Sequence, residues 1–129
     1  MAADIRIGKV SSVNYDDGLV RVTYPDKDDS TTTEIPVFSF TDEYKMPKVD
    51  SKVLVIHLSD GSSAGVVLGH FWDSGNKPPE AGSNEFHKEL ADNYGDATVH
   101  CKDRKITIYG DIIELKADTK IILNAPTVE

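Results

Sequence analysis

Apolar and polar residues alternate in three short runs along the last third of the chain. The runs are residues 106–108, 113–115 and 121–123, and their starts are seven or eight residues apart. Turn-forming residues fill the gaps, beginning at Gly110 and at Asp118. Alternation with a period of two is typical of a strand with one buried face, so the pattern predicts three very short strands joined by tight turns.

Strands of this length cannot fold over one another into a thick core. Burial of a few aliphatic side chains does not offset the backbone entropy lost when about thirty residues become ordered, and a lone ribbon leaves both its edges unpaired. Copies wound around a common axis pair every edge and enclose one narrow apolar column. Residues 97–129 are therefore predicted to form a rigid stalk of several chains. The side chains predicted to face its axis are Ile106, Ile108, Ile113, Leu115, Ile121 and Leu123. The alternative is an ordinary meander packed on the N-terminal part of the same chain.

The N-terminal part also has strand-like runs and no convincing helix. These runs are residues 7–14, 19–24, 34–40, 52–58 and 65–71. The last is continuously apolar, which is typical of a strand buried on both faces. Turn signals recur about every ten residues, so an all-β fold is predicted, with a small closed or half-closed barrel over residues 1–72.

Residues 73–96 are predicted to be a linker and transition segment. Their first half is rich in Gly, Ser and Pro and has no large apolar residue. Within the second half, Phe86 and Leu90 are four residues apart. This spacing permits one or two helical turns over residues 85–92, and a strand leading into the stalk is the other possibility.

Charge and cysteine content narrow the function classes. Residues 1–96 hold 17 acidic and 9 basic side chains, whereas residues 97–129 hold five of each, and the whole chain has a formal charge of −8. An acidic body argues against nucleic-acid binding, which depends on Lys and Arg. The lone Cys101 excludes an intrachain disulfide and fits a reducing compartment. No apolar run is long enough for a transmembrane helix, and no signal peptide is visible at the start.

No constellation of catalytic or metal-ligating residues stands out. The four histidines are isolated in sequence, and His57 near Asp60 has no nucleophile motif beside it. The loop that begins at Asp26 resembles a calcium loop, but it has Thr31 and Val37 where that motif needs Gly and Glu. We therefore expect no enzyme activity, metal or cofactor. The aromatic side chains that could stack on a ligand are Phe38, Phe40, Tyr44 and Trp72. They keep open an alternative function, an OB-fold module that binds oligosaccharide or nucleic acid.

The order of short motifs between residues 5 and 71 resembles the phage baseplate assembly protein V family, the central spike of contractile tails. The matching segments are Arg6-Ile7-Gly8-Lys9-Val10, Val20-Arg21-Val22-Thr23-Tyr24-Pro25, Ile35-Pro36-Val37, Met46-Pro47-Lys48-Val49, Val53-Leu54-Val55 and Gly65-Val66-Val67-Leu68-Gly69. Members of that family combine an OB-type barrel with a trimeric β-helix, and the short-strand segment at residues 97–129 falls where the β-helix falls. Two features depart from the family. Asp50 replaces a usual glycine, and the end of the chain lacks the His-x-His pair that holds iron at the apex of many family spikes.

The resemblance implies a structural role and several partners. It implies a homotrimer whose barrels dock on the trimeric tail hub and whose stalk pierces the envelope of a target cell, with transient contact with the target membrane and no nucleic acid. The missing apex pair leaves three possibilities: a blunt spike, a separate tip protein, or a shortened sequence. The parent particle would be a phage tail or a tail-like bacteriocin, and the chain would be made in the bacterial cytoplasm. The linker is too short for the lysozyme domain that larger relatives carry.

Overall fold

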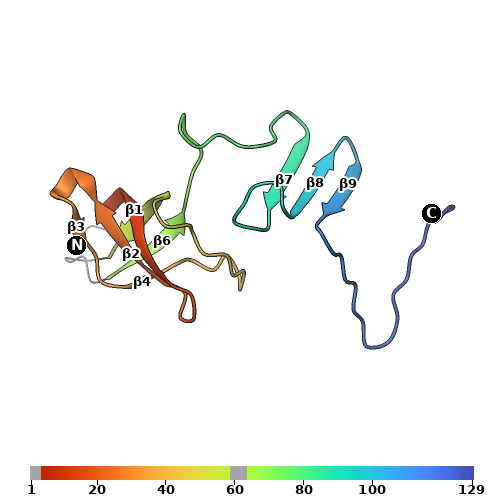
Figure 1. The fold of residues 1–129 in the computed structure, drawn as a ribbon, viewed down its shortest axis with the longest axis horizontal. Coiled ribbons are helices and arrows are strands. Elements are labelled where there is room, and N and C mark those ends of the chain that lie inside the picture. The colour runs from red at the N-terminus through yellow and green to blue at the C-terminus, as the bar shows by residue number, and fades with distance from the viewer. Residues whose placement is uncertain (1–3, 59–63) are drawn as a thin grey trace. The chain divides into compact units, whose positions relative to one another are not determined.

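The computed structural model describes residues 4–58 and 64–129, and this part of the chain is all-β, as predicted (Figure 1). Its only helical element is a 3-10 turn, η1 (Pro25–Lys27). The chain divides into two compact units, residues 1–78 and 79–129. The strands are β1 (Asp4–Asn14), β2 (Leu19–Tyr24), β3 (Ser30–Thr31), β4 (Ile35–Pro36), β5 (Lys52–His57), β6 (Gly65–Gly69), β7 (Glu85–Glu89), β8 (Thr98–Lys102) and β9 (Lys105–Tyr109). No membrane-spanning helix is found in residues 4–58 and 64–129.

The strands of the first unit pair in a ring. β1 pairs with β2 along one edge and with β5 along the other, and β5 in turn pairs with β6. β4 pairs with β2, and Val37 directly after β4 bridges Val67 of β6 in parallel orientation. The pairings therefore run from β1 through β2, β4, β6 and β5 back to β1. All strand pairings other than this bridge are antiparallel.

Alternate residues of these strands point inward and make the core. The buried apolar residues are Val10, Val20, Val22, Tyr24, Ile35, Met46, Val53, Val55 and Val67. Gly8 of β1 lets the Tyr24 ring pack closely on the strand. A Cβ atom at that position would lie 2.5 Å from Val22 Cγ1 and 2.8 Å from Tyr24 Cδ1. Seven of these nine residues are Val or Ile, so the core is built mainly from β-branched side chains on the inward face of the strands.

Two strand predictions for this unit were wrong in detail. The run at residues 34–40 shortens to β4 and the bridging Val37, because Phe40, Thr41 and Asp42 have left-handed φ angles of 49°, 66° and 68°. Such angles end an extended conformation. The run at residues 65–71 is not buried on both faces, since the burial of β6 alternates and only its inward face is fully covered. A chain that forms a curled sheet has one core, and the outer face of β6 lies outside it.

The second unit contains an antiparallel sheet in the order β7-β8-β9. Residues 85–92, for which the sequence allowed a helix or a strand, begin with β7. β9 contains the first of the three short runs predicted in the C-terminal segment. Residues 110–129, all of which the structure describes, contain no strand and run as an open segment beyond β9 (Figure 1). The predicted strands at residues 113–115 and 121–123 therefore have no partner within one chain.

Candidate functional site: an exposed apolar surface in the C-terminal unit

The two faces of the β7-β8-β9 sheet have opposite chemistry. Directly paired residues of neighbouring strands project to the same side, and side chains alternate along each strand. His87 pairs with His100, which places the polar residues of β7 and β8 on one face. The residues on the other face are Phe86, Lys88, Val99, Cys101, Ile106 and Ile108. The second face, apart from Lys88, is apolar.

The apolar face is the exposed one. Ile106 and Ile108 are 70% and 58% exposed, and Phe86 is 57% exposed. On the polar face, the side chains of Glu85, Glu89 and His87 are only 5%, 8% and 12% exposed. In a water-soluble single chain the apolar face of a sheet is normally buried and the polar face exposed, because removing apolar surface from water lowers the free energy most. The sheet therefore presents to solvent the surface that a soluble protein normally covers.

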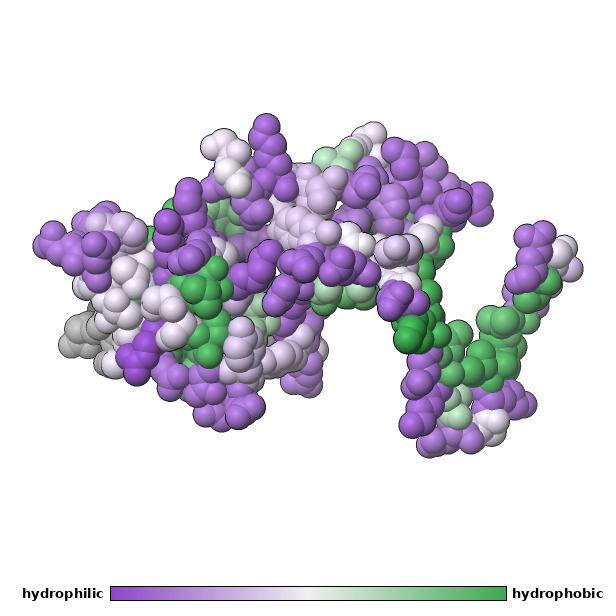
Figure 2. Space-filling model, in the orientation of Figure 1, coloured by the Kyte–Doolittle hydropathy of each residue, from purple (hydrophilic) through white to green (hydrophobic). Residues whose placement is uncertain are grey.

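Apolar side chains are also exposed along residues 110–129, the open segment after β9. The large aliphatic residues there are all at least half exposed: Ile112, Ile113, Leu115, Ile121, Ile122, Leu123 and Val128. Figure 2 shows apolar residues gathered along this segment. We call the exposed residues of the sheet face and of residues 110–129 the apolar surface. A contiguous surface of this kind marks an interaction site.

The structure places the six predicted axis residues in two groups. Ile106 and Ile108 lie on the same face of β9. Cys101 and Val99 of β8, which pair with them, lie on this face too, as does Phe86 of β7, which pairs with Cys101. The other four lie in residues 110–129, which form no strand pairing within the chain. Sequence reasoning missed Phe86, although it alternates with the polar residues of 85–89. Cys101 lies half-buried on the apolar face.

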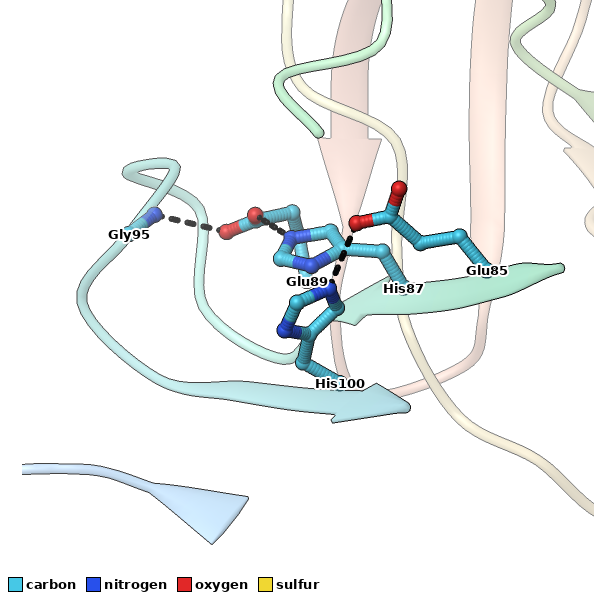
Figure 3. Close-up of polar contacts among 5 residues, drawn as sticks. All are labelled: Glu85, His87, Glu89, Gly95 and His100. Carbon is cyan, nitrogen blue, oxygen red and sulfur yellow. Dashed lines mark hydrogen bonds and ion pairs between the residues drawn. The ribbon is translucent and has the colours of Figure 1, made fainter. Parts of the chain in front are cut away.

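The polar face holds a cluster of ionisable side chains, which we call the His–Glu cluster: Glu85, His87, Glu89 and His100 (Figure 3). Nε2 of His100 lies 2.7 Å from Oε1 of Glu85, and Nε2 of His87 hydrogen-bonds to Oε2 of Glu89. The two imidazole rings meet edge to face with centroids 5.4 Å apart. The Gly95 backbone N–H donates to Oε1 of Glu89 at 2.7 Å, which fixes this carboxylate from the β7–β8 connection. Sequence reasoning treated these histidines as isolated, because only the strand register brings them together.

The remaining candidate residues lie in the first unit. The Tyr24 hydroxyl is 2.5 Å from Nε2 of His57, so this histidine is a buried core group. The pairing of His57 with Asp60 cannot be described, because Asp60 lies outside the described residues. Burial raises the pKa of Tyr24 to about 12, and the nearby Arg6 opposes part of that increase.

A shallow apolar groove of about 350 Å³ lies on the outer face of the first unit. Its lining residues are Ile7, Phe40, Leu54, Leu68, Gly69, His70 and Phe71. Phe40 also contacts Phe38 edge to face, with ring centroids 4.7 Å apart. Burial, together with Lys45, lowers the pKa of His70, so the imidazole at the groove has a weakened tendency to carry charge.

Comparison with models of protein families and with curated proteins finds no match. Function must therefore be inferred from the fold and from the geometry of these sites. Among the described residues, the apolar surface is the feature with the clearest physical consequence, because apolar side chains in contact with water favour association.

Proposed function

We propose that this chain is the subunit of a homotrimeric spike. In this proposal the first unit is an OB-type barrel, and residues 97–129 wind with two copies of themselves into a triple-stranded β-helix. The observation that carries the proposal is the inverted exposure within the β7-β8-β9 sheet. Its apolar residues Phe86, Ile106 and Ile108 are exposed, whereas the side chains of Glu85, His87 and Glu89 on the other face of β7 are mostly buried. Three copies arranged around an axis would turn that face inward and bury it.

Backbone pairing supports the same arrangement. β9 is an edge strand of its sheet, and residues 110–129 contain no strand, so their N–H and C=O groups have no ladder within the chain. An open apolar edge is a template for pairing with another chain. Neighbouring copies would supply both the missing hydrogen bonds and the missing apolar cover, and a closed threefold arrangement leaves no edge open.

The first unit supports the barrel half of the proposal. Its strands pair in a ring of β1, β2, β4, β6 and β5, which is the number of strands in an OB-type barrel. The core lies inside this ring. Five of the six segments that resemble the baseplate assembly protein V family fall on these strands, and the segment at residues 46–49 lies in the connection before β5. The ring of strands therefore agrees with the barrel that the resemblance implies.

The spike would act mechanically in a contractile phage tail or a tail-like particle. The barrels would form a collar that docks on the trimeric tail hub, and the stalk would be driven through the envelope of a target cell. A β-helix suits that load, since separating it means breaking the pairings of three chains together. A separate tip protein would cap the far end, and contact with the target membrane would be transient.

The mass of the particle in solution tests this proposal. Light scattering of the full chain should give three times the 14.2 kDa of one chain. Ile108→Asp and Leu115→Asp each place a charge on the apolar surface and should yield monomers or aggregates. The control is Thr107→Asp, which adds the same charge to β9 on the opposite face and should leave the mass unchanged. A well-behaved monomer of the unmutated chain would contradict the proposal.

A ligand-binding OB module is the alternative function. The exposed aromatic residues Phe38, Phe40 and Trp72 are the observation that favours it. This alternative predicts a monomer or dimer that binds single-stranded nucleic acid or an oligosaccharide, with salt-sensitive affinity for nucleic acid. Trp72 is the only tryptophan, so its fluorescence during titration with an oligonucleotide reports such binding directly. A trimer whose fluorescence does not respond excludes this alternative.

A further inference from the structure

Three residues near one end of the β7-β8 pair bring metal-ligating atoms together. Glu85 belongs to β7, His100 belongs to β8, and Glu80 precedes β7 in the chain. One carboxylate oxygen from each glutamate and one ring nitrogen of His100 all lie within 4.8 Å of one another. Carboxylate oxygen and imidazole nitrogen together form the ligand set typical of Zn²⁺ and related transition-metal cations.

The carboxyl group of Glu85 provides an independent sign of a missing ligand. Its side chain is 5% exposed, and Oε1 accepts a hydrogen bond from His100. Oε2 is buried and has no hydrogen-bond partner in the described part of the chain. A buried carboxylate oxygen without a partner costs more than any ordinary lost hydrogen bond, so such an atom calls for an ion or an ordered water.

The chain makes room at this oxygen. Gly82 lies between Glu80 and Glu85 in sequence, and a Cβ atom there would come within 2.9 Å of Oε2. Residue 82 therefore leaves space beside the carboxylate that a larger residue would occupy. Of the three buried side-chain atoms without a partner in residues 4–58 and 64–129, two belong to the His–Glu cluster: Glu85 Oε2 and His87 Nδ1.

Charge points the same way. Two carboxylates within 4.8 Å of each other repel unless a cation lies between or beside them. His100 supplies a positive charge only when protonated, whereas a divalent cation neutralises both carboxylates and uses the imidazole in its neutral form. Lys102 lies directly opposite Glu85 on β8, but it is exposed to solvent, whereas the Glu85 carboxylate is buried.

The rest of the cluster holds the ligands in place. His87 packs edge to face on the His100 ring, Glu89 binds His87, and the Gly95 N–H binds Glu89 (Figure 3). Contacts of this kind fix the orientation of ligating side chains around a metal. A site on a paired strand with such support needs little rearrangement to close around an ion.

We propose that Glu80, Glu85 and His100 bind one divalent transition-metal cation of the Zn²⁺ class per chain. The ion ties the segment before β7 to the polar face of the sheet, and water completes its coordination. All three ligands come from one chain, so the site does not depend on the trimer. A monomer that binds the metal would support this inference while contradicting the proposed spike.

Metal titration of the full chain tests the inference. Protein dialysed against EDTA and then freed of chelator is titrated with Zn²⁺ by calorimetry and with Co²⁺ by visible absorption. We expect one ion per chain and the absorption bands of Co²⁺ bound to nitrogen and oxygen ligands. Glu80→Gln, Glu85→Gln and His100→Gln should each weaken Zn²⁺ binding at least tenfold. Glu114→Gln and His70→Gln change the same residue types elsewhere in the chain and should bind Zn²⁺ as the unmutated protein does.

Glu80 is exposed, so Glu80→Gln should fold and test the inference even if Glu85→Gln or His100→Gln does not fold. Circular dichroism identifies which variants keep the sheet. No Zn²⁺ binding by the unmutated chain at millimolar metal overturns the inference and makes the cluster a hydrogen-bond network only. Unchanged affinity in folded Glu80→Gln overturns it as well, because the ion then binds elsewhere.

Discussion

Tyr24 is a polar side chain enclosed by the core of the first unit. It is 2% exposed, its hydroxyl meets His57, and the Arg6 guanidinium lies 5.5 Å from its ring centroid. The absent side chain of Gly8 leaves the space that the ring occupies. A tyrosine in this position contributes apolar packing and one buried hydrogen bond, and it resists ionisation because the phenolate would be poorly solvated.

The shifted pKa of Tyr24 predicts a loss of stability at high pH. Burial raises that pKa from 10.0 to about 12 in the folded chain. Between these two values the unfolded chain loses a proton that the folded chain keeps, so the free energy of unfolding is highest below pH 10 and falls as pH rises toward 12. Urea denaturation at pH 9 and pH 11 should show this fall, and it should be smaller in Tyr24→Phe.

Absorbance at 295 nm provides the direct check on that prediction. Subtracting the alkaline titration of Tyr24→Phe from that of the unmutated protein isolates the ionisation of this one residue. A midpoint near pH 10 in the difference curve would mean that the hydroxyl is solvated, and the prediction would then be wrong.

The contact between His87 and His100 could not be predicted from the sequence. His87 and His100 were read as isolated because 12 residues separate them in the chain. Their contact depends on the connection between β7 and β8, where Leu90 N–H bonds to Ala97 C=O at 2.8 Å and Gly95 has a φ of 93°. A loop of that length can close in several ways, so the sequence did not specify which residues face each other.

Among the elements, the alternating or β-branched runs of the first unit were predictable, whereas the alternating runs at residues 113–115 and 121–123 form no strand within one chain. Residues 19–24 were predicted as a strand and form β2 with the same bounds, and residues 52–58 differ from β5 only by the last residue. Residues 34–40 failed because left-handed backbone at Phe40 leaves no signal in an apolar run. Six aliphatic residues of the apolar surface were named from the sequence as facing a stalk axis, which stays a prediction. Ile112, Ile122 and Val128 were not named, and the contribution of β7 required the register.

Hydrogen exchange should show whether the segment after β9 has strand partners. Residues 110–129 contain no strand within one chain, so their amides in an isolated chain would exchange at the rate of open backbone. In the proposed stalk the amides of residues 111–123 pair with neighbouring copies, and exchange should slow at least about a hundredfold. Mass spectrometry of peptides from this segment measures the difference.

The exposed loop at residues 41–45 provides an internal reference for fast exchange. Ile108→Asp should return the segment at residues 111–123 to the rate of that loop, because it removes the partners without changing those residues. Complete exchange of the segment in the unmutated protein at the earliest time point would rule out a paired stalk.

At the scale of the whole molecule, the distribution of charge is compatible with the proposed threefold assembly. The acidic excess lies in residues 1–96, whereas residues 97–129 have five basic and five acidic side chains. Three copies of a neutral segment can pack around an axis without accumulating charge there, since like charges brought close together oppose association. The excess charge of the assembled particle would be divided equally between the barrels at residues 1–72 and the segment at residues 73–96, each with four more acidic than basic side chains, and there it favours solubility.

Coupling between folding and assembly predicts that stability depends on protein concentration. If three chains fold together, mass action stabilises the native state as concentration rises, and a tenfold increase should move the thermal midpoint upward by about 3–8 °C. Scans of the full chain at about 1, 10 and 100 µM measure this shift. Ile108→Asp is the matched control, because a chain that folds without partners has a midpoint that does not change with concentration. If the unmutated protein behaved like that control in both unfolding and refolding, the apolar surface would have to be covered within one chain, and the spike would lose its physical basis.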